Sequence, residues 1–200
     1  EEIEVAVKMT TVQHVIAASK NRQLVREFQQ EVRFMCNLTH PNICDFFGAI
    51  SNTDADSALP MSIIMEKLDI SLHQAIKGGG ERKLPLGRDN PQQFVDVIKG
   101  IIEALAYLHS TGLDGKKVVH RDLKPENVML TEHNIPKLID FGLSKETKAG
   151  VGSTMNSKGT KEWMAPEQRQ NGGCSTHSDV FAVGLIGIFI LEGKTPNEMG

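Results

Sequence analysis

The stretch that decides the fold is His120-Arg121-Asp122-Leu123-Lys124-Pro125-Glu126-Asn127, which is followed later in the chain by Asp140-Phe141-Gly142. The first segment contains a carboxylate that can accept a proton, a lysine that can neutralise a phosphate, and a carboxamide. The second segment adds another carboxylate. Carboxylate and carboxamide oxygens are the ligands that Mg²⁺ takes in proteins, together with water and phosphates. The two segments therefore predict a site that handles phosphate groups with Mg²⁺.

Apolar periodicity on the N-terminal side of this stretch predicts three strands and one helix. Alternating residues predict the first strand, helical spacing predicts the helix, and two apolar runs rich in β-branched and aromatic residues predict the other strands. The expected elements are a strand over 3–8, a helix over 21–37, and strands over 43–50 and 61–65. A small sheet-rich unit is therefore expected before residue 68.

The rest of the chain is expected to be mostly helical. An apolar stripe that begins at Pro91 predicts a long helix to about residue 108. The stretch 180–191 is so apolar that we expect a buried core helix, and it is too short to cross a bilayer. A polar tract from Gly78 to Asn90 predicts a loop.

Composition excludes several classes of protein. The chain has 200 residues, 40% hydrophobic content and a formal net charge of −3, which is typical of a globular protein and gives no reason to expect nucleic acid or a membrane as partner. Its cysteines, Cys36, Cys44 and Cys174, are odd in number and scattered, which argues against a disulfide framework or a zinc site. We expect a reducing, cytoplasmic setting.

Two further motifs flank the central pair. Val5-Ala6-Val7-Lys8 precedes it, and Ala165-Pro166-Glu167 follows it. In this order and spacing the motifs resemble a eukaryotic protein kinase domain from Val5 to about Pro196. The resemblance implies an α+β, two-lobe protein kinase fold: a partial sheet-rich N-lobe with one helix in residues 1–68, and a larger helical C-lobe in residues 69–200.

The same resemblance assigns roles to residues of the central pair. Transfer of a γ-phosphoryl group gathers negative charge on oxygens, so the protein must align the reacting groups and neutralise that charge. Catalytic roles are implied for Asp122, Lys124, Asn127 and Asp140. Asp122 accepts or orients the proton of the acceptor hydroxyl, Lys124 lies against the moving phosphate, and Asn127 and Asp140 hold Mg²⁺.

Nucleotide-binding residues are implied on the N-terminal side. Lys8 matches the strand lysine that grips the α and β phosphates of ATP, and Glu31 matches the helix glutamate that holds this lysine. Met65 matches the residue that guards the back pocket. The remaining residues implied to contact adenine are Glu66 and Leu68, through backbone groups, and Ala6 and Met129, which sandwich the base.

The family likeness also implies a stack of side chains and a regulated segment. Phe46, Met35, Phe141 and His120 are expected to stack between the lobes, above Asp179. The segment between Asp140 and Glu167 carries Ser153, Thr154 and Ser157, on which an upstream kinase could place a phosphate for Arg121 to bind. A flexible polar loop without regulation is the alternative.

Substrate preference is predicted from two positions. Lys124 follows Asp122 as in serine/threonine kinases, and Thr160 matches a threonine that bonds back to the catalytic loop. A protein substrate with a Ser or Thr acceptor is therefore expected. The stretch 162–167 resembles tyrosine-kinase-like and mitogen-activated-kinase-kinase-kinase members, whereas 137–145 resembles calcium-dependent kinases, so the subgroup stays open.

Two features depart from the family pattern. No glycine-rich loop precedes Lys8, and the arginine that normally pairs with the position of Glu167 is absent. We therefore expect a fragment of a longer kinase, with Glu167 as a buried carboxylate without its partner, and expect the 200 residues alone to be poorly soluble or inactive. A pseudokinase or scaffold that binds partners without catalysis is one alternative, and a small-molecule kinase is another.

Overall fold

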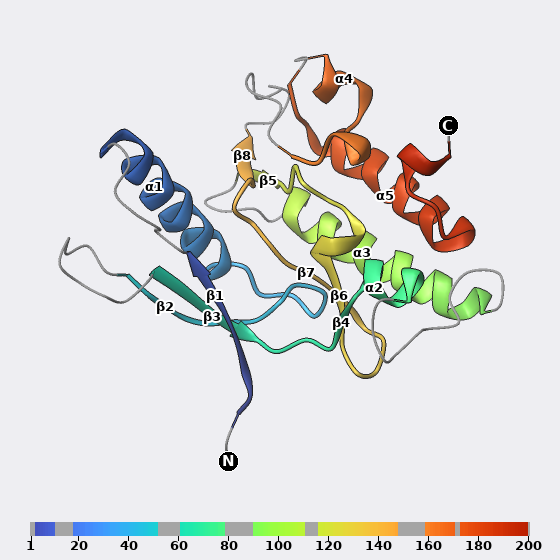
Figure 1. Ribbon diagram of the computed structural model, residues 1–200, viewed down its shortest axis with the longest axis horizontal. Coiled ribbons are helices and arrows are strands. Elements are labelled where there is room, and N and C mark those ends of the chain that lie inside the picture. The colour runs from blue at the N-terminus through green and yellow to red at the C-terminus, as the bar shows by residue number, and fades with distance from the viewer. Residues whose placement is uncertain are drawn as a thin grey trace.

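The computed structural model describes residues 3–10, 18–51, 61–78, 90–110, 116–147, 159–170 and 173–199. Its N-terminal part is a three-stranded antiparallel sheet with strand order β1-β3-β2. The strands are β1 (Val5–Thr10), β2 (Phe46–Ile50) and β3 (Met61–Glu66), and the long helix α1 (Ala18–Met35) lies beside them (Figure 1). Because successive side chains of a strand point to opposite faces, Ala6 and Lys8 share one face of β1.

The C-terminal part combines helices with very short strands. Its two small sheets are antiparallel, with strand orders β4-β6-β7 and β5-β8. The strands are β4 (Ile70–Ser71), β5 (Lys117–Val119), β6 (Val128–Leu130), β7 (Pro136–Leu138) and β8 (Lys145–Thr147). The α-helices are α2 (Leu72–Lys77), α3 (Pro91–Ser110), α4 (Pro166–Arg169) and α5 (Thr176–Glu192). Single 3₁₀ turns are η1 (Pro125–Asn127), η2 (Lys161–Trp163) and η3 (Pro196–Glu198).

The long helices begin and end at residues suited to those places. Asn90 accepts a hydrogen bond from the backbone N–H of Gln93 at 3.2 Å, and Pro91 follows as the first residue of α3, where its missing N–H is not needed. Ser175 caps α5, and Gly193 ends it with φ 66°. This left-handed conformation is one that glycine adopts without strain.

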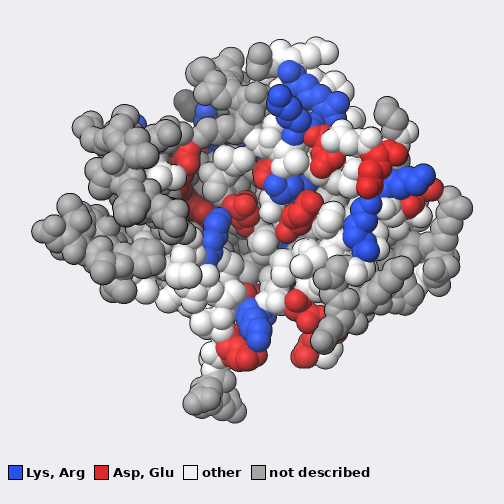
Figure 2. All heavy atoms as spheres, in the orientation of Figure 1, with Lys and Arg blue, Asp and Glu red and all other residues white. Residues whose placement is uncertain are grey.

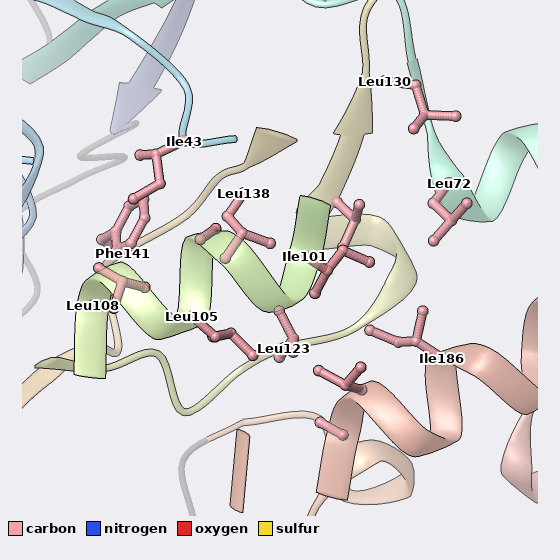
Figure 3. Close-up of a cluster of buried hydrophobic side chains, with 14 of the residues drawn as sticks. Ile43, Leu72, Ile101, Leu105, Leu108, Leu123, Leu130, Leu138, Phe141 and Ile186 are labelled. Atoms are coloured by element: carbon pink, nitrogen blue, oxygen red, sulfur yellow. The ribbon is translucent and has the colours of Figure 1, made fainter. Parts of the chain in front are cut away.

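The main hydrophobic core lies between α3, α5 and the short strands. Fully buried members include Ile101 and Leu108 of α3, Leu138 of β7 and Ile186 of α5. Figure 3 shows these side chains converging, with Phe141 and Ile43 at the end of the cluster that adjoins the N-terminal part. The core therefore reaches the segment that contains Asp140-Phe141-Gly142 and fixes its position.

The segment that follows α1 connects the two parts. Asn42 donates a side-chain hydrogen bond to the carbonyl oxygen of Pro136 at 2.9 Å. Gly100 of α3 lies directly beneath this contact: a Cβ atom at Gly100 would lie 2.5 Å from Pro136 Cγ and 2.7 Å from Asn42 Nδ2. Only a residue without a side chain fits at such a close approach.

The structure corrects four expectations about the elements. The helix expected over 21–37 is α1 at 18–35, and the strand expected over 43–50 begins at residue 46. The C-terminal part contains short strands that no periodic pattern predicted. The stretch 180–191 is helical but not buried throughout, since Val180 is 60% exposed and Ile188 is 42% exposed while Ile186 is fully buried.

Within the residues that the structure describes, no helix combines the length and the apolar character needed to span a membrane. The polar tract that was expected to form a loop lies outside the described residues, apart from Gly78 and Asn90 at its ends.

Candidate active site

Lys8, Glu31 and Asp140 meet at the junction of the two parts. The ammonium group of Lys8, on β1, lies 2.6 Å from Glu31 Oε1 on α1 and 3.0 Å from Asp140 Oδ1. The Glu31 side chain is only 8% exposed, whereas those of Lys8 and Asp140 are about 40% exposed. The structure thus places one cation between two carboxylates, one enclosed and one facing solvent.

Burial and charge act in opposite directions on the pKa values of these three groups. Burial works to raise the pKa of Asp140, but the Lys8 ammonium, the charge of His120 and the Gly142 N–H together outweigh it and hold this pKa below its ordinary value. Burial also raises the pKa of Glu31, and here the attraction of Lys8 does not fully compensate. Although burial works to lower the pKa of Lys8, the two carboxylates raise it. Asp140 is therefore the carboxylate of the pair that ionises more readily.

Asp140 has an unusual backbone conformation. Its φ is 64°, in the left-handed region that non-glycine residues seldom adopt. The N–H of Gly142 lies 3.4 Å from Asp140 Oδ1. A Cβ atom at Gly142 would lie 3.3 Å from that same oxygen and 3.4 Å from Glu31 Oε2. Glycine at this position therefore lets both carboxylates approach the backbone.

A second cluster surrounds Asp122. Its Oδ1 accepts hydrogen bonds from the backbone N–H of Thr160 at 2.9 Å and from the Thr160 hydroxyl at 3.1 Å. The ammonium of Lys124 lies 3.1 Å from Asp122 Oδ2 and 2.7 Å from Thr160 Oγ1. Asn127 donates to the Asp122 carbonyl at 2.8 Å and to its carboxylate at 3.2 Å. These bonds fix the orientation of the Asp122 carboxylate.

The donor set fits Mg²⁺. Asn127 uses its amide N–H₂ on Asp122, so its oxygen faces away from these contacts, and within the described residues this oxygen accepts no hydrogen bond. Asp140 is partly exposed and engages Lys8 through Oδ1, which leaves Oδ2 available. Two protein oxygens plus water and phosphates suit Mg²⁺, which keeps several waters. No cluster of three or more His, Cys, Asp or Glu that could hold a metal occurs in the described part of the chain.

Asp179 supports the catalytic segment from below. This carboxylate is 1% exposed and accepts hydrogen bonds from the backbone N–H groups of His120 at 2.9 Å and Arg121 at 3.0 Å. Its Oδ2 also lies 2.8 Å from His109 Nε2. A buried carboxylate needs such partners, and Arg121 has a positive φ of 73°, so these bonds hold a strained turn directly before Asp122.

The structure shows one contact of the expected stack of side chains. The ring centroids of His120 and Phe141 are 5.2 Å apart. Phe141 and Met35 both belong to the hydrophobic core cluster, and Phe46 is packed against this cluster. A continuous stack of all four side chains stays a prediction.

The residues expected around the adenine base and its back pocket come from two sheets and from Leu68, which follows β3. Ala6 and Met65 are direct cross-strand partners on β1 and β3, while Met129 lies on β6 and pairs with Ser71. All five residues of this group, Ala6, Met65, Glu66, Leu68 and Met129, are half-buried. The N–H of Glu66 donates to the carbonyl of Asp45 at 2.9 Å, and the carbonyl of Glu66 accepts a hydrogen bond from the Cys44 thiol at 3.7 Å.

Sequence reasoning missed Lys137. Its side chain is 11% exposed, and its ammonium lies 2.6 Å from Glu66 Oε2 and 3.6 Å from Asp45 Oδ2. It thus joins β7, the end of β3 and the segment that follows α1. The position of Lys137 within a short strand beside Leu138 gave no signal, because its partners are distant in the sequence.

The structure corrects the expectation for Glu167, which is exposed rather than buried. It accepts a hydrogen bond from the Ser178 hydroxyl at 2.8 Å. The candidate phosphorylation sites Ser153, Thr154 and Ser157 lie outside the described residues.

Acidic and basic side chains lie close together at the centre of the molecular face that Figure 2 shows.

The site and fold agree with comparisons to known proteins. The family model "Protein kinase domain" matches residues 1–199, so the chain belongs to the protein kinase family. Its mixed arrangement of helices and small antiparallel sheets is that of a partial protein kinase fold. Members of this family use ATP and Mg²⁺.

Two of three similar relatives are protein kinases by name, and one of these is named as a serine/threonine kinase. The chain is 34% identical to "Serine/threonine-protein kinase CTR1" of Arabidopsis thaliana over 92% of its length, and 32% identical to "Death-associated protein kinase 2" of Mus musculus over 90%. It is 33% identical to "Cytokinesis protein sepH" of Emericella nidulans over 92%. The chain spans 20%, 45% and 12% of these relatives, respectively. Its division near residue 68 stays a prediction.

Proposed function

We propose that this chain is the catalytic part of a protein serine/threonine kinase, which transfers the γ-phosphoryl group of ATP to Ser or Thr hydroxyls of protein substrates. The observation that carries the proposal is the Asp122 cluster, in which one carboxylate is oriented by Thr160, Lys124 and Asn127. A carboxylate held in this way can accept a proton from a hydroxyl group placed beside it.

Lys124 supplies charge where the phosphoryl group moves. Its side chain is 21% exposed, and its ammonium lies between Asp122 and Thr160. From there it can contact a phosphate oxygen at the mouth of the site and offset the negative charge that gathers during transfer. Lys8 contributes in the same manner to the rest of the triphosphate, since Glu31 and Asp140 hold its ammonium at the junction of the two parts.

Asn127 and Asp140 are the residues that hold Mg²⁺ in this proposal. The bound cation neutralises phosphate oxygens and orients the triphosphate. The protein contributes the fixed position of both oxygens: η1 places Asn127 through its bonds to Asp122, and the core contact of Phe141 places Asp140.

Preference for Ser or Thr acceptors is supported by the contact between Lys124 and Thr160 and by the relative named as a serine/threonine kinase. The proposal also includes that the substrate is a protein and that the enzyme acts in the cytoplasm. We also propose that an upstream kinase modifies Ser153, Thr154 or Ser157.

A scaffold without catalysis is the second candidate. It predicts binding of ATP without transfer. The intact cluster of Lys8, Glu31, Asp122, Asn127 and Asp140 favours the enzyme, because a binding module has no need for an oriented carboxylate beside the acceptor position.

The test is transfer of radiolabelled phosphate from ATP to a mixture of protein substrates, followed by analysis of the phosphorylated amino acids. We expect phosphoserine and phosphothreonine, and we expect Asp122→Asn to lower the rate by about 10² to 10⁴. Equal rates for the two proteins would refute the proposed catalysis. Phosphotyrosine as the main product would refute only the substrate preference, and ATP binding without transfer would favour the scaffold.

A further inference from the structure

Two contacts tie α1 to the segment that follows Gly142. Gln30 donates from its side-chain amide to the carbonyl oxygen of Ser144 at 2.5 Å. Arg33 lies with its guanidinium nitrogen Nη2 2.7 Å from Glu146 Oε1. Both α1 residues flank Glu31 in sequence, so the same helical turns carry the partner of Lys8 and the contacts to this segment.

Glu146 is held from two directions. Its Oε2 accepts a hydrogen bond from the Lys116 ammonium at 2.9 Å, while its Oε1 faces Arg33. Lys116 directly precedes β5, and β8, which contains Glu146, pairs with β5 so that Glu146 lies opposite Val118. One carboxylate therefore links α1 to the strand that leads into the catalytic segment.

The enclosed position of Glu146 strengthens its ion pairs with Arg33 and Lys116. The Glu146 side chain is only 14% exposed, whereas Arg33 and Lys116 are 53% and 43% exposed. An exposed ion pair contributes little because water screens it. A mostly enclosed carboxylate is different, since it must keep cations to offset its desolvation. Glu146 therefore holds both cations, and each cation can relax into solvent if the carboxylate is removed.

We propose that Glu146 is a positioning residue for phosphoryl transfer. Its carboxylate holds Arg33 and thereby keeps α1 in the orientation in which Glu31 reaches Lys8. This inference rests on the proposed function, but it concerns the position of α1. Glu146 does not contact the reacting groups directly, because its described partners are Arg33 and Lys116 and neither belongs to the Lys8 or Asp122 clusters.

The arrangement has a regulatory consequence. The position of α1 that we describe needs no phosphate group on the segment, because a carboxylate of the chain already occupies the Arg33 guanidinium. A phosphate on Ser153, Thr154 or Ser157 would then add contacts elsewhere, for example at Arg121, and would not be required to bring Glu31 to Lys8.

The test uses phosphatase-treated protein and four single variants. We expect Glu146→Gln and Arg33→Gln each to lower kcat/KM for ATP roughly fivefold or more, within the usual range of coupling between sites. Arg33→Lys should recover most of the loss because it keeps the charge. The matched control is Arg26→Gln: Arg26 is an exposed arginine of the same helix that makes no hydrogen bond or ion pair within the described residues, and its loss should change nothing.

Double variants separate positioning from general stability. If Glu146 acts through Arg33 and Glu31, then Glu146→Gln should have no further effect in the Arg33→Gln or the Glu31→Gln background. A loss by Glu146→Gln of less than twofold, or an unchanged loss in the Glu31→Gln background, would overturn the proposal.

Hydrogen–deuterium exchange tests the inference independently of catalysis. Residues 24–35 should exchange faster in Glu146→Gln and Arg33→Gln than in wild type, and Arg26→Gln should match wild type. If wild type transfers no phosphate but this exchange pattern appears, the proposed function fails and the positioning role stands. Unchanged exchange in Glu146→Gln refutes the positioning role whatever the activity.

Discussion

Lys124 donates a hydrogen bond to the hydroxyl of Thr160 at 2.7 Å, although the two residues are 36 positions apart. The same hydroxyl donates to Asp122. Thr160 therefore stands between the proposed proton acceptor and the proposed phosphate-binding cation. Its hydroxyl keeps the opposite charges of Asp122 and Lys124 in a fixed relation, which the backbone alone would not secure.

Replacement of Thr160 by Val should lower kcat about 10-fold to 100-fold with little change in KM for ATP, since the variant keeps the shape but loses both side-chain hydrogen bonds. Thr160→Ser keeps the hydroxyl and should retain most of the activity. Steady-state kinetics of both variants check this. Similar rates for Thr160→Val and wild type would show that the hydroxyl does not align the site.

Glu31→Gln should abolish the ion pair with Lys8. The free energy of unfolding of this variant, relative to that of the wild type, should nevertheless increase as the pH rises. The folded-state pKa of Glu31 is raised by burial. Above the ordinary pKa of about 4.5 the unfolded chain ionises first, so the wild type loses stability as pH rises through the folded pKa, whereas the glutamine variant does not. Melting temperatures of both proteins at pH 4.5, 5.5 and 7 measure the difference. A difference that is independent of pH would contradict the raised pKa.

Lys137→Met should destabilise the junction between β3 and β7 by about 1 to 3 kcal/mol, because it leaves the Glu66 carboxylate without its closest cation. Adding Glu66→Gln should recover part of the loss. Denaturant unfolding gives the free energies. The control is Lys67→Met, which removes an exposed pair with Glu4 at 2.9 Å and should change the free energy of unfolding by less than about 0.5 kcal/mol. Equal effects of the two lysine variants would contradict the prediction.

Alkylation of thiols should distinguish the three cysteines. Cys36 is exposed, whereas Cys44 and Cys174 are buried. Burial raises the pKa of Cys44 to about 12, so it carries almost no thiolate at pH 8, and burial also raises the pKa of Cys174. Iodoacetamide at pH 8 should modify Cys36 alone until the protein is unfolded, as peptide mass spectrometry would show. Early modification of Cys44 would mean that the segment after α1 opens readily.

The sequence predicted the elements in which an apolar repeat extends over many residues. α3 repeats apolar residues over five turns, so its start at Pro91 and its buried face followed from spacing. The Asp122 and Asp140 segments were found because their side-chain types and order are specific to one chemistry, and Lys8 and Glu31 were found by resemblance and lie 2.6 Å apart. The structure places Lys8, Glu31 and Asp140 in one cluster and Asp122, Lys124 and Asn127 in another, while their catalytic roles stay predictions.

The rest was beyond sequence reasoning for physical reasons. Strands of three residues such as β5 and β8 are too short to show alternation. The outward face of α5 is apolar in sequence, so composition predicted burial where Val180 is exposed. The links Arg33–Glu146 and Lys137–Glu66 join charged residues that are common on protein surfaces, and only the folded chain distinguishes a solvated charge from a paired one.

Because of the close approach at Gly100, a substitution at this one position should make the stability of the protein sensitive to temperature. A methyl group added at Gly100 would clash with Pro136 and Asn42 and push α3 away from their contact. The fold would tolerate this strain only while the remaining packing is strong. Gly100→Ala is thus a rational starting point for a heat-sensitive allele, one that works at low temperature and fails on warming without a change at any proposed catalytic residue.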